Sequence, residues 1–257
     1  MGTPLAKRGP LAGAVLRDAG DTALVLEFGT TIERELLERV SALDRHVRRL
    51  DADGRLEGLV ETVPTFRSLA LLFDPLRTSP ATLLEALAAS ADEGAAAEAA
   101  DRRPRAWCLP VLYGGEHGPD LDELAGRAGL APDALVARHA DTPLVVYMLG
   151  FLPGFAFLGD VDASLRQPRR ETPRVRVPAG SVAVANTLSA VYPWKSPGGW
   201  HLIGHCPVPL FDPSREVPAL LRAADTVRFR RVEAEEHARL ARDVHDGRFD
   251  PAALRER

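Results

Sequence analysis

The stretch from Tyr147 to Phe211 constrains the fold more than any other part of the chain, because it is dense in glycine and proline yet keeps short apolar runs. The runs in and beside it read VVYMLGF, SVAVA and WHLIGH. Glycine and proline interrupt regular structure and form tight turns. The pattern therefore predicts closely spaced β-strands and not a flexible linker.

Four arginines lie within this stretch and are separated by prolines: Arg169, Arg170, Arg174 and Arg176. Alternate side chains of an extended segment share a face, so we expect Arg174 and Arg176 to point one way and Val175 and Val177 the other. Two guanidinium groups on one face can bind a carboxylate or a phosphate. An exposed edge strand also carries proline and charge, and the spacing alone leaves both interpretations open.

Composition excludes several classes of protein. The chain has 257 residues, enough for one large or two modest domains, and its net charge of -4 gives no basic field for nucleic acid. It has no apolar run near the length of a membrane span and no signal-peptide pattern. Its two cysteines, Cys108 and Cys206, are far apart in sequence, which is typical of a reducing compartment. We therefore expect a cytoplasmic protein that binds neither membrane nor nucleic acid.

The N-terminal part predicts a mixed α and β domain. Two strand patterns, AVLR and TALVLEF, precede a helical pattern that Thr30 or Thr31 could cap. Two more strand patterns follow, and then a second helix with Ser79 as its cap and Pro80 at its first position. The order strand, helix, strand, strand, helix after a short first strand favours a ferredoxin-like α+β domain.

The segment from Gly94 to Arg105 lacks apolar periodicity, and we expect it to link two domains. The expected domains are residues 1–98 and residues 99–257. The second domain is mainly β, with a helix beginning near Pro119 and a charged amphipathic helix near the C-terminus.

Several polar side chains beyond the arginines are candidates for chemistry. Glu116 and His117 lie in a glycine turn just before Asp120 and could transfer protons. Asp120 could instead only favour the start of the following helix. Lys195 could contact an anion or be an exposed loop lysine.

Metal and nucleotide motifs are weak or absent in the sequence. His201 and His205 are four residues apart, and a zinc site could be argued with His117 or Cys206, but no further ligand spacing supports it. We therefore predict no metal and expect His201 to have a polar or anion-facing role. The sequence contains no GxxxxGK[ST] phosphate loop.

Five ordered blocks carry a resemblance to a known family: YGGEHGPDLDELA, GFLPGFAFLG, TPRVRVPAGSVAVA, YPWKSPGGWHLIG and LFDP. With GDTALVLEFG and VPTFRSLALLFDP near the N-terminus, they resemble the family of the B-type subunit of 5-oxoprolinase. The same family includes the sporulation-kinase inhibitor and subunit 1 of allophanate hydrolase, which is similar to part of urea carboxylase. The resemblance covers residues 12–232, nearly the whole chain.

The resemblance implies a cyclophilin-like β-barrel as the second domain and a composite site with a sister subunit of related fold. It implies ATP-dependent opening of 5-oxoproline to L-glutamate, together with a lactam-utilisation protein, and little activity for this subunit alone. The alternatives are an inhibitor of a sensor histidine kinase and a subunit of an allophanate hydrolase or urea carboxylase system. The candidate catalytic residues are Glu116, His117 and His205, and the candidate anion-binding residues are Arg170, Arg174, Arg176, Lys195 and His201.

The chain departs from the family pattern at three places. Where relatives have a GGQTG-like run, it has Asn186 to Ala190, with Leu188 in place of a polar amide. Where relatives have arginine after LIG, it has His205, which is mostly neutral near pH 7 unless a carboxylate raises its pKa. Asp160 stands where glycine is common. These departures leave the expected fold unchanged but bear on the activity.

Overall fold

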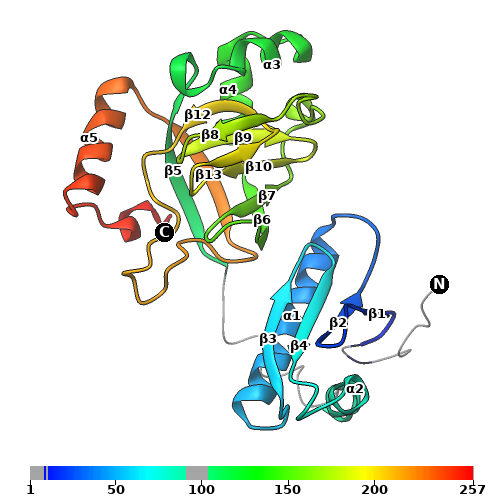
Figure 1. Cartoon of the computed structure of the whole chain (residues 1–257). Helices are drawn as coiled ribbons and strands as arrows, with labels where there is room; N and C mark the ends of the chain where they lie inside the picture. The colour runs from blue at the N-terminus through cyan, green and yellow to red at the C-terminus, as the bar shows by residue number, and fades with distance from the viewer. Residues whose placement is uncertain (1–8, 10, 91–103, 257) are drawn as a thin grey trace. The chain divides into compact units, whose positions relative to one another are not determined.

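The computed structural model describes residue 9, residues 11–90 and residues 104–256 (Figure 1). The chain divides into two compact units, Met1–Arg103 and Pro104–Arg257. The boundary expected between residues 98 and 99 lies outside the described residues. Arg105 was expected to end the linker, but its guanidinium pairs with Asp225, so it belongs to the second unit.

The first unit is a four-stranded sheet with two helices. Its elements are β1 (Val15–Asp18), β2 (Ala23–Glu27), α1 (Arg34–Ala52), β3 (Leu59–Pro64), β4 (Ser68–Phe73) and α2 (Pro80–Ala89). The strand order is β1-β2-β4-β3, and every neighbouring pair is antiparallel. The apolar sides of α1 and α2 join one core with the inward residues of β2 and β4. The α+β content is as expected, and the ferredoxin-like assignment stays a prediction.

The two helix starts in this unit differ in their capping. The Ser79 hydroxyl accepts a hydrogen bond from the Thr82 amide at 3.2 Å, so the predicted cap of α2 is confirmed. The cap expected at Thr30 or Thr31 is wrong, because α1 has Glu33 at its N-cap position. The Thr31 hydroxyl instead donates to the Glu33 carboxylate at 2.7 Å.

The second unit contains a closed barrel of seven strands. The strands form the ring β10-β7-β6-β13-β5-β12-β9, in which β13 and β5 are parallel and the other pairs are antiparallel. Their bounds are β5 Ala106–Tyr113, β6 Leu144–Leu149, β7 Ala156–Gly159, β9 Ser181–Ala185, β10 Leu188–Val191, β12 His201–His205 and β13 Thr226–Arg231. The mainly β prediction is confirmed, and the cyclophilin-like assignment stays a prediction.

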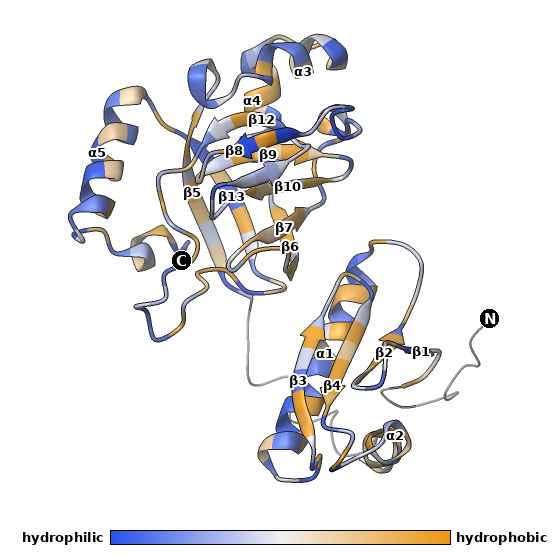
Figure 2. Ribbon diagram, viewed as in Figure 1, coloured by the Kyte–Doolittle hydropathy of each residue, from blue (hydrophilic) through white to orange (hydrophobic). Residues whose placement is uncertain are grey.

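Further elements surround the barrel. They are η1 (Gly115–His117), α3 (Leu121–Ala128), α4 (Pro132–Asp141), η2 (Ala163–Leu165), α5 (Ala234–His245), η3 (Pro251–Leu254) and a two-stranded sheet of β8 (Arg174–Val177) and β11 (Ser196–Gly198). Aliphatic side chains from β5, β6, β9 and β12 form one core with residues of α3 and α4. Figure 2 shows β8 in both blue and orange, since it alternates arginine and valine.

The turn from Gly114 to Asp120 is seated directly on β12. The Gly114 amide donates to the Ile203 carbonyl at 3.0 Å, and the Asp120 amide donates to the Leu202 carbonyl at 3.0 Å. A Cβ atom on Gly118 would lie 2.2 Å from the Ile203 carbonyl oxygen. Only glycine allows this approach, and the approach fixes Asp120 against the strand.

We expect Gly118→Ala to lower the free energy of unfolding by about 2 kcal/mol, because the added methyl group overlaps backbone that has little room to move. Gly126→Ala in α3 is the matched control, since a Cβ there meets nothing within 4 Å. The control should raise stability by about 0.5 kcal/mol, because alanine favours a helix interior over glycine. Urea unfolding measures both, and equal stability of Gly118→Ala and the wild type would contradict the seating of this turn.

Candidate functional site

The carboxylate of Asp120 is the centre of a charged site in the second unit. The residue is 4% exposed. Its Oδ1 atom accepts from Arg174 Nη2 at 2.6 Å and from Arg170 Nη1 at 2.9 Å, and its Oδ2 atom accepts from the Leu202 amide at 2.6 Å. Two guanidinium groups and a strand amide therefore meet on one buried carboxylate.

Asp120 stays ionised in this position. Burial acts to raise the pKa of its carboxyl group, but hydrogen bonds from Arg174 and the Leu202 amide, with the charges of Arg174 and Arg170, outweigh it. The pKa consequently lies below the ordinary value of 3.8. Asp120 does occupy the N-cap position of α3, but its side chain makes no capping bond. The simple capping role considered for it is therefore not what the structure shows.

The expected arginine pair is different in the structure. Arg174 binds Asp120, whereas Arg176 is exposed, and Arg170 takes the second place on the carboxylate. The strict alternation expected for β8 also fails, because Val175 is 90% exposed while Val177 is buried. The cause is that β8 pairs only with β11, across a register shift between Ser196 and Gly198, and has no sheet to cover its outer side.

Three hydrogen bonds to its backbone anchor the arginine loop, which we define as residues 166–173. His201 Nε2 donates to the Pro168 carbonyl at 2.9 Å, and the Arg170 amide donates to the Gly199 carbonyl at 2.8 Å. The Asn186 amide donates to the Gln167 carbonyl at 2.6 Å. These contacts position Arg170 before any ligand arrives.

This anchoring gives His201 a polar role, one of the two roles expected for it. The ring is 3% exposed and is bonded to the arginine loop. Its expected contact with an anion stays a prediction. Lys195 is exposed and follows Trp194, whose indole donates to the Pro153 carbonyl at 2.9 Å. Lys195 and Arg176 are both left to solvent on the surface of the second unit.

The arrangement leaves positive charge to spare. Two guanidinium groups face one carboxylate, so the group carries a net charge of about +1. Within the described residues, Arg170 Nε is buried and has no hydrogen-bond partner. The side chains of Arg170 and Arg174 are 30% and 23% exposed, so solvent reaches them. An anion with oxygen acceptors would compensate the spare charge at the exposed part of the two guanidinium groups.

The candidate catalytic residues form a second group at the other end of β12. The rings of His117 and His205 have centroids 5.1 Å apart, and Glu116 is exposed beside His117. Both nitrogens of His205 are engaged, Nδ1 with His237 Nε2 at 2.8 Å and Nε2 with the Ala179 carbonyl at 3.1 Å. Sequence reasoning missed His237, which is far from His205 in the chain.

The departures from the family pattern have clear structural consequences. Asn186 and Thr187 form an exposed two-residue turn with Asn186 at φ 52°, while Leu188 is buried at the start of β10. This turn reaches the site through the Asn186 amide and not through Leu188. Asp160 has φ 69°, a conformation that favours glycine, and it accepts a hydrogen bond from the Tyr147 hydroxyl at 2.9 Å.

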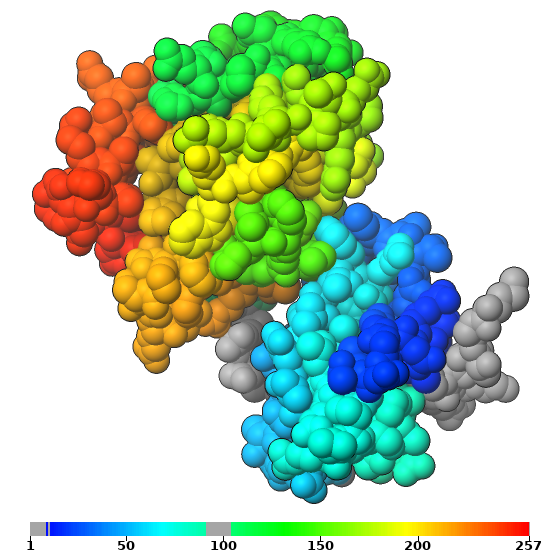
Figure 3. All heavy atoms as spheres, viewed as in Figure 1, coloured from blue at the N-terminus to red at the C-terminus, as the bar shows by residue number. Residues whose placement is uncertain are grey.

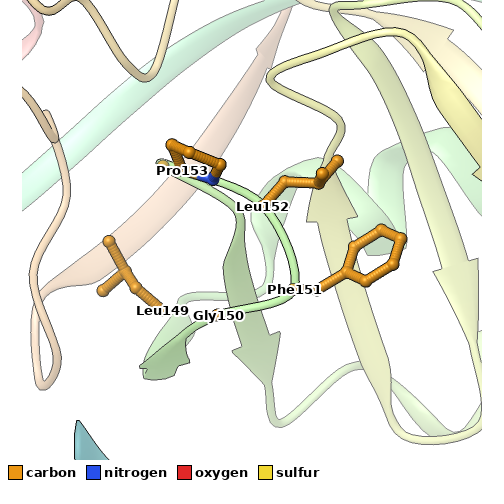
Figure 4. A pocket seen from close by; sticks show the side chains of 6 residues that line it. Leu149, Gly150, Phe151, Leu152 and Pro153 are labelled. Carbon is orange, nitrogen blue, oxygen red and sulfur yellow. The ribbon is translucent and has the colours of Figure 1, made fainter.

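An open pocket of about 380 Å³ lies at the turn between β6 and β7 (Figure 4). Its lining is Leu149, Gly150, Phe151, Leu152, Pro153 and Gly154. Phe151 is 66% exposed, although Phe155, four residues later, is buried. The pocket has no charged lining residue, whereas the site around Asp120 contains three charged side chains.

The described residues contain no group of three or more histidine, cysteine, aspartate or glutamate side chains placed to hold a metal ion. In the same part of the chain, no helix is both long enough and apolar enough to cross a bilayer.

We expect Asp120→Asn to lower the free energy of unfolding by about 2 kcal/mol near pH 7, because the change leaves two guanidinium groups facing a neutral amide. The folded-state pKa of Asp120 is depressed, so its contribution is present above the ordinary value of 3.8 and is lost as pH falls through the folded-state pKa. The difference from the wild type should therefore shrink in acid. Denaturant titrations across pH measure this, with exposed Asp122→Asn as control, and a difference that grows in acid would contradict it.

Comparisons with known proteins cover most of the chain. Residues 14–221 match the carboxyltransferase domain, subdomain C and D. The chain is 36% identical over 230 residues to the B-type subunit of 5-oxoprolinase from Bacillus subtilis, covering 86% of this chain and 94% of that protein.

Two solved structures are also similar. The crystal structure of TTHA0988 is 40% identical with a TM-score of 0.71 over 82% of this chain, and this chain spans 40% of that longer one. The Kluyveromyces lactis urea carboxylase has a TM-score of 0.74 over 92% of this chain and 23% of its own, but at 21% identity it indicates the shared fold alone. From the domain match and the near full-length similarity to the Bacillus protein, we conclude that the chain belongs to the family of 5-oxoprolinase B-type subunits.

Proposed function

We propose that this chain is the B-type subunit of an ATP-dependent 5-oxoprolinase, which opens 5-oxoproline to L-glutamate. The observation that carries the proposal is the 36% identity that extends over 94% of a protein named for that role. The charged site around Asp120 supports the class of substrate, because 5-oxoproline carries a carboxylate and a partly exposed arginine pair is suited to bind one.

In this proposal Arg170 and Arg174 bind the substrate anion. Asp120 holds both guanidinium groups by one oxygen atom, which leaves other N–H donors of each group for a ligand. Arg176 and Lys195 are further exposed positive side chains of the same unit. The arginine loop is already anchored by backbone contacts, so little conformational entropy is lost on binding.

For proton transfer we propose Glu116 and His117, which lie in the same turn as Asp120. His205 is less suited to act as a base. Burial first, and then the charges of His237 and His117, lower its pKa to about 4, and both of its nitrogens are engaged. His205 is neutral near pH 7 and has no free lone pair. We therefore assign it a packing role in place of the expected catalytic one.

We propose that the activity needs further subunits: a sister barrel subunit, a lactam-utilisation subunit, and ATP bound by the complex. The length of TTHA0988 supports this, because a chain of this kind forms only 40% of that polypeptide. The lack of a phosphate loop in the sequence supports placing the nucleotide elsewhere. The two free cysteines support a cytoplasmic location. The histidine-kinase and urea carboxylase alternatives have no comparable support.

Reconstitution tests the proposal. The chain is mixed with the sister and lactam-utilisation subunits, and glutamate release from 5-oxoproline is measured with ATP. We expect activity only in the full mixture. Arg170→Lys and Arg174→Lys should each lower kcat/KM by about tenfold or more, because lysine keeps the charge but loses the planar fork.

The matched control is Arg176→Lys, which removes an exposed arginine two residues from Arg174 and should change kcat/KM by less than about twofold. Robust ATP-dependent activity of the single chain would contradict the need for partners. Full activity of both Arg170→Lys and Arg174→Lys in the complex would contradict the assigned anion site while leaving the family role in place.

A further inference from the structure

Three histidines from three separate elements meet away from the Asp120 site. His117 comes from η1, His205 ends β12, and His237 lies in α5. The ring centroids are 5.1 Å apart for His117 and His205, 5.2 Å for His117 and His237, and 5.0 Å for His205 and His237. We call this set the histidine cluster. It joins α5 to the barrel.

The hydrogen bonds of the cluster fix which nitrogens carry hydrogen. A carbonyl oxygen can only accept, so His205 Nε2 donates to the Ala179 carbonyl. His205 Nδ1 is then a lone pair, and His237 Nε2 donates to it. Both rings are neutral in this arrangement. An added proton on His205 requires His237 to change tautomer, and a second proton places two like charges on touching rings.

The surroundings of the cluster offer little compensation for such a charge. Burial is the largest cause that lowers the pKa of both His205 and His237, and the charges of the other histidines add to it. Only the Ala179 carbonyl acts in the opposite direction on His205. The nearby carboxylates have other roles: Glu236 of α5 is paired with Arg230 at 2.8 Å, Glu233 lies 3.8 Å from Arg231, and Glu116 is exposed. Cys206, next to His205, has its pKa raised to about 12 and stays neutral.

The histidine cluster is one of the contacts that attach helix α5 to the barrel. The helix lies on the outside of its unit, at the orange-red end of the colour range in Figure 3. Its buried residues are His237 and Leu240, and five of its other ten side chains are charged. Glu236 of the helix also pairs with Arg230 of β13 at 2.8 Å, so His237 is one of several contacts that hold the helix.

We propose that the histidine cluster is an acid-sensitive latch, in which protonation releases α5 while the barrel itself stays folded. The proposal rests on the geometry of the cluster, and it shares His117 with the proposed proton transfer. The turn that carries His117 stays seated on β12 through its own hydrogen bonds, so release of α5 changes the surroundings of His117 and leaves Asp120 in place.

The direction of the pH effect on α5 follows from the protons that each form binds. In the docked form the pKa of His205 is lowered from the ordinary 6.5 to about 4, and that of His237 is also lowered. The released form therefore binds more protons between about pH 6.5 and pH 4, so falling pH in this window favours release. Above this window both forms are neutral at these rings, and the latch is closed.

Hydrogen exchange of the full chain tests the latch. Protection of α5 amides, corrected for intrinsic rates, is compared with that of β9 amides from about pH 7.5 to about pH 5. In the wild type, protection of α5 relative to β9 should fall by about tenfold or more, the factor of one pKa unit. In His237→Leu the relative protection should fall by less than in the wild type, because the leucine keeps an apolar anchor and removes one of the two titrating groups.

The matched control is His245→Gln, which removes an exposed histidine from the end of the same helix and should behave as the wild type. His205→Gln is a second test that does not depend on the folding of His237→Leu, and it should also weaken the pH response. Relative protection that does not change with pH in the wild type, or that falls as much in both cluster variants as in the wild type, would overturn the proposal. Parallel loss of protection in β9 would also overturn it, since that means unfolding of the whole barrel.

Discussion

The charged site of the second unit depends on one buried carboxylate. Asp120 receives hydrogen bonds from Arg170, Arg174 and the Leu202 amide, and it thereby ties the arginine loop and β8 to β12 and the start of α3. An isolated buried charge would be strongly unfavourable, so the carboxylate and its partners must form together. Gly118 allows this arrangement, because it lets the turn before Asp120 lie against the Ile203 carbonyl.

The contact of Asp120 with the two arginines creates a binding site because its charges do not cancel. One carboxylate cannot neutralise two guanidinium groups, and one buried nitrogen of Arg170 has no partner among the described residues. Asp120 thus fixes the orientation of both arginines and leaves them short of acceptors. A rigid donor set of this kind is suited to a small planar anion, which connects a feature of stability to the proposed handling of 5-oxoproline.

Much of this could be predicted from sequence, and the failures have physical causes. Strand and helix periodicity predicted the α+β first unit, the β-rich second unit and the Ser79 cap. Sequence reasoning paired Arg174 with Arg176, whereas the structure places Arg170 beside Arg174 on Asp120, because period-two reasoning compares only residues of one strand. The role of Asp120 was missed because an aspartate before a helix also fits a cap. His237 carries no local signal and meets His205 only through the fold.

A double-mutant cycle between Asp120 and Arg174 tests whether the buried carboxylate holds the arginines in place. The unfolding free energies of the wild type, Asp120→Asn, Arg174→Gln and the double variant are compared near pH 7, with Asp122→Asn replacing the first variant in a control cycle. We predict a coupling energy of about 1.5 kcal/mol or more for Asp120 with Arg174, and additive effects in the control. A coupling below about 0.3 kcal/mol in the first cycle would contradict the role given to Asp120.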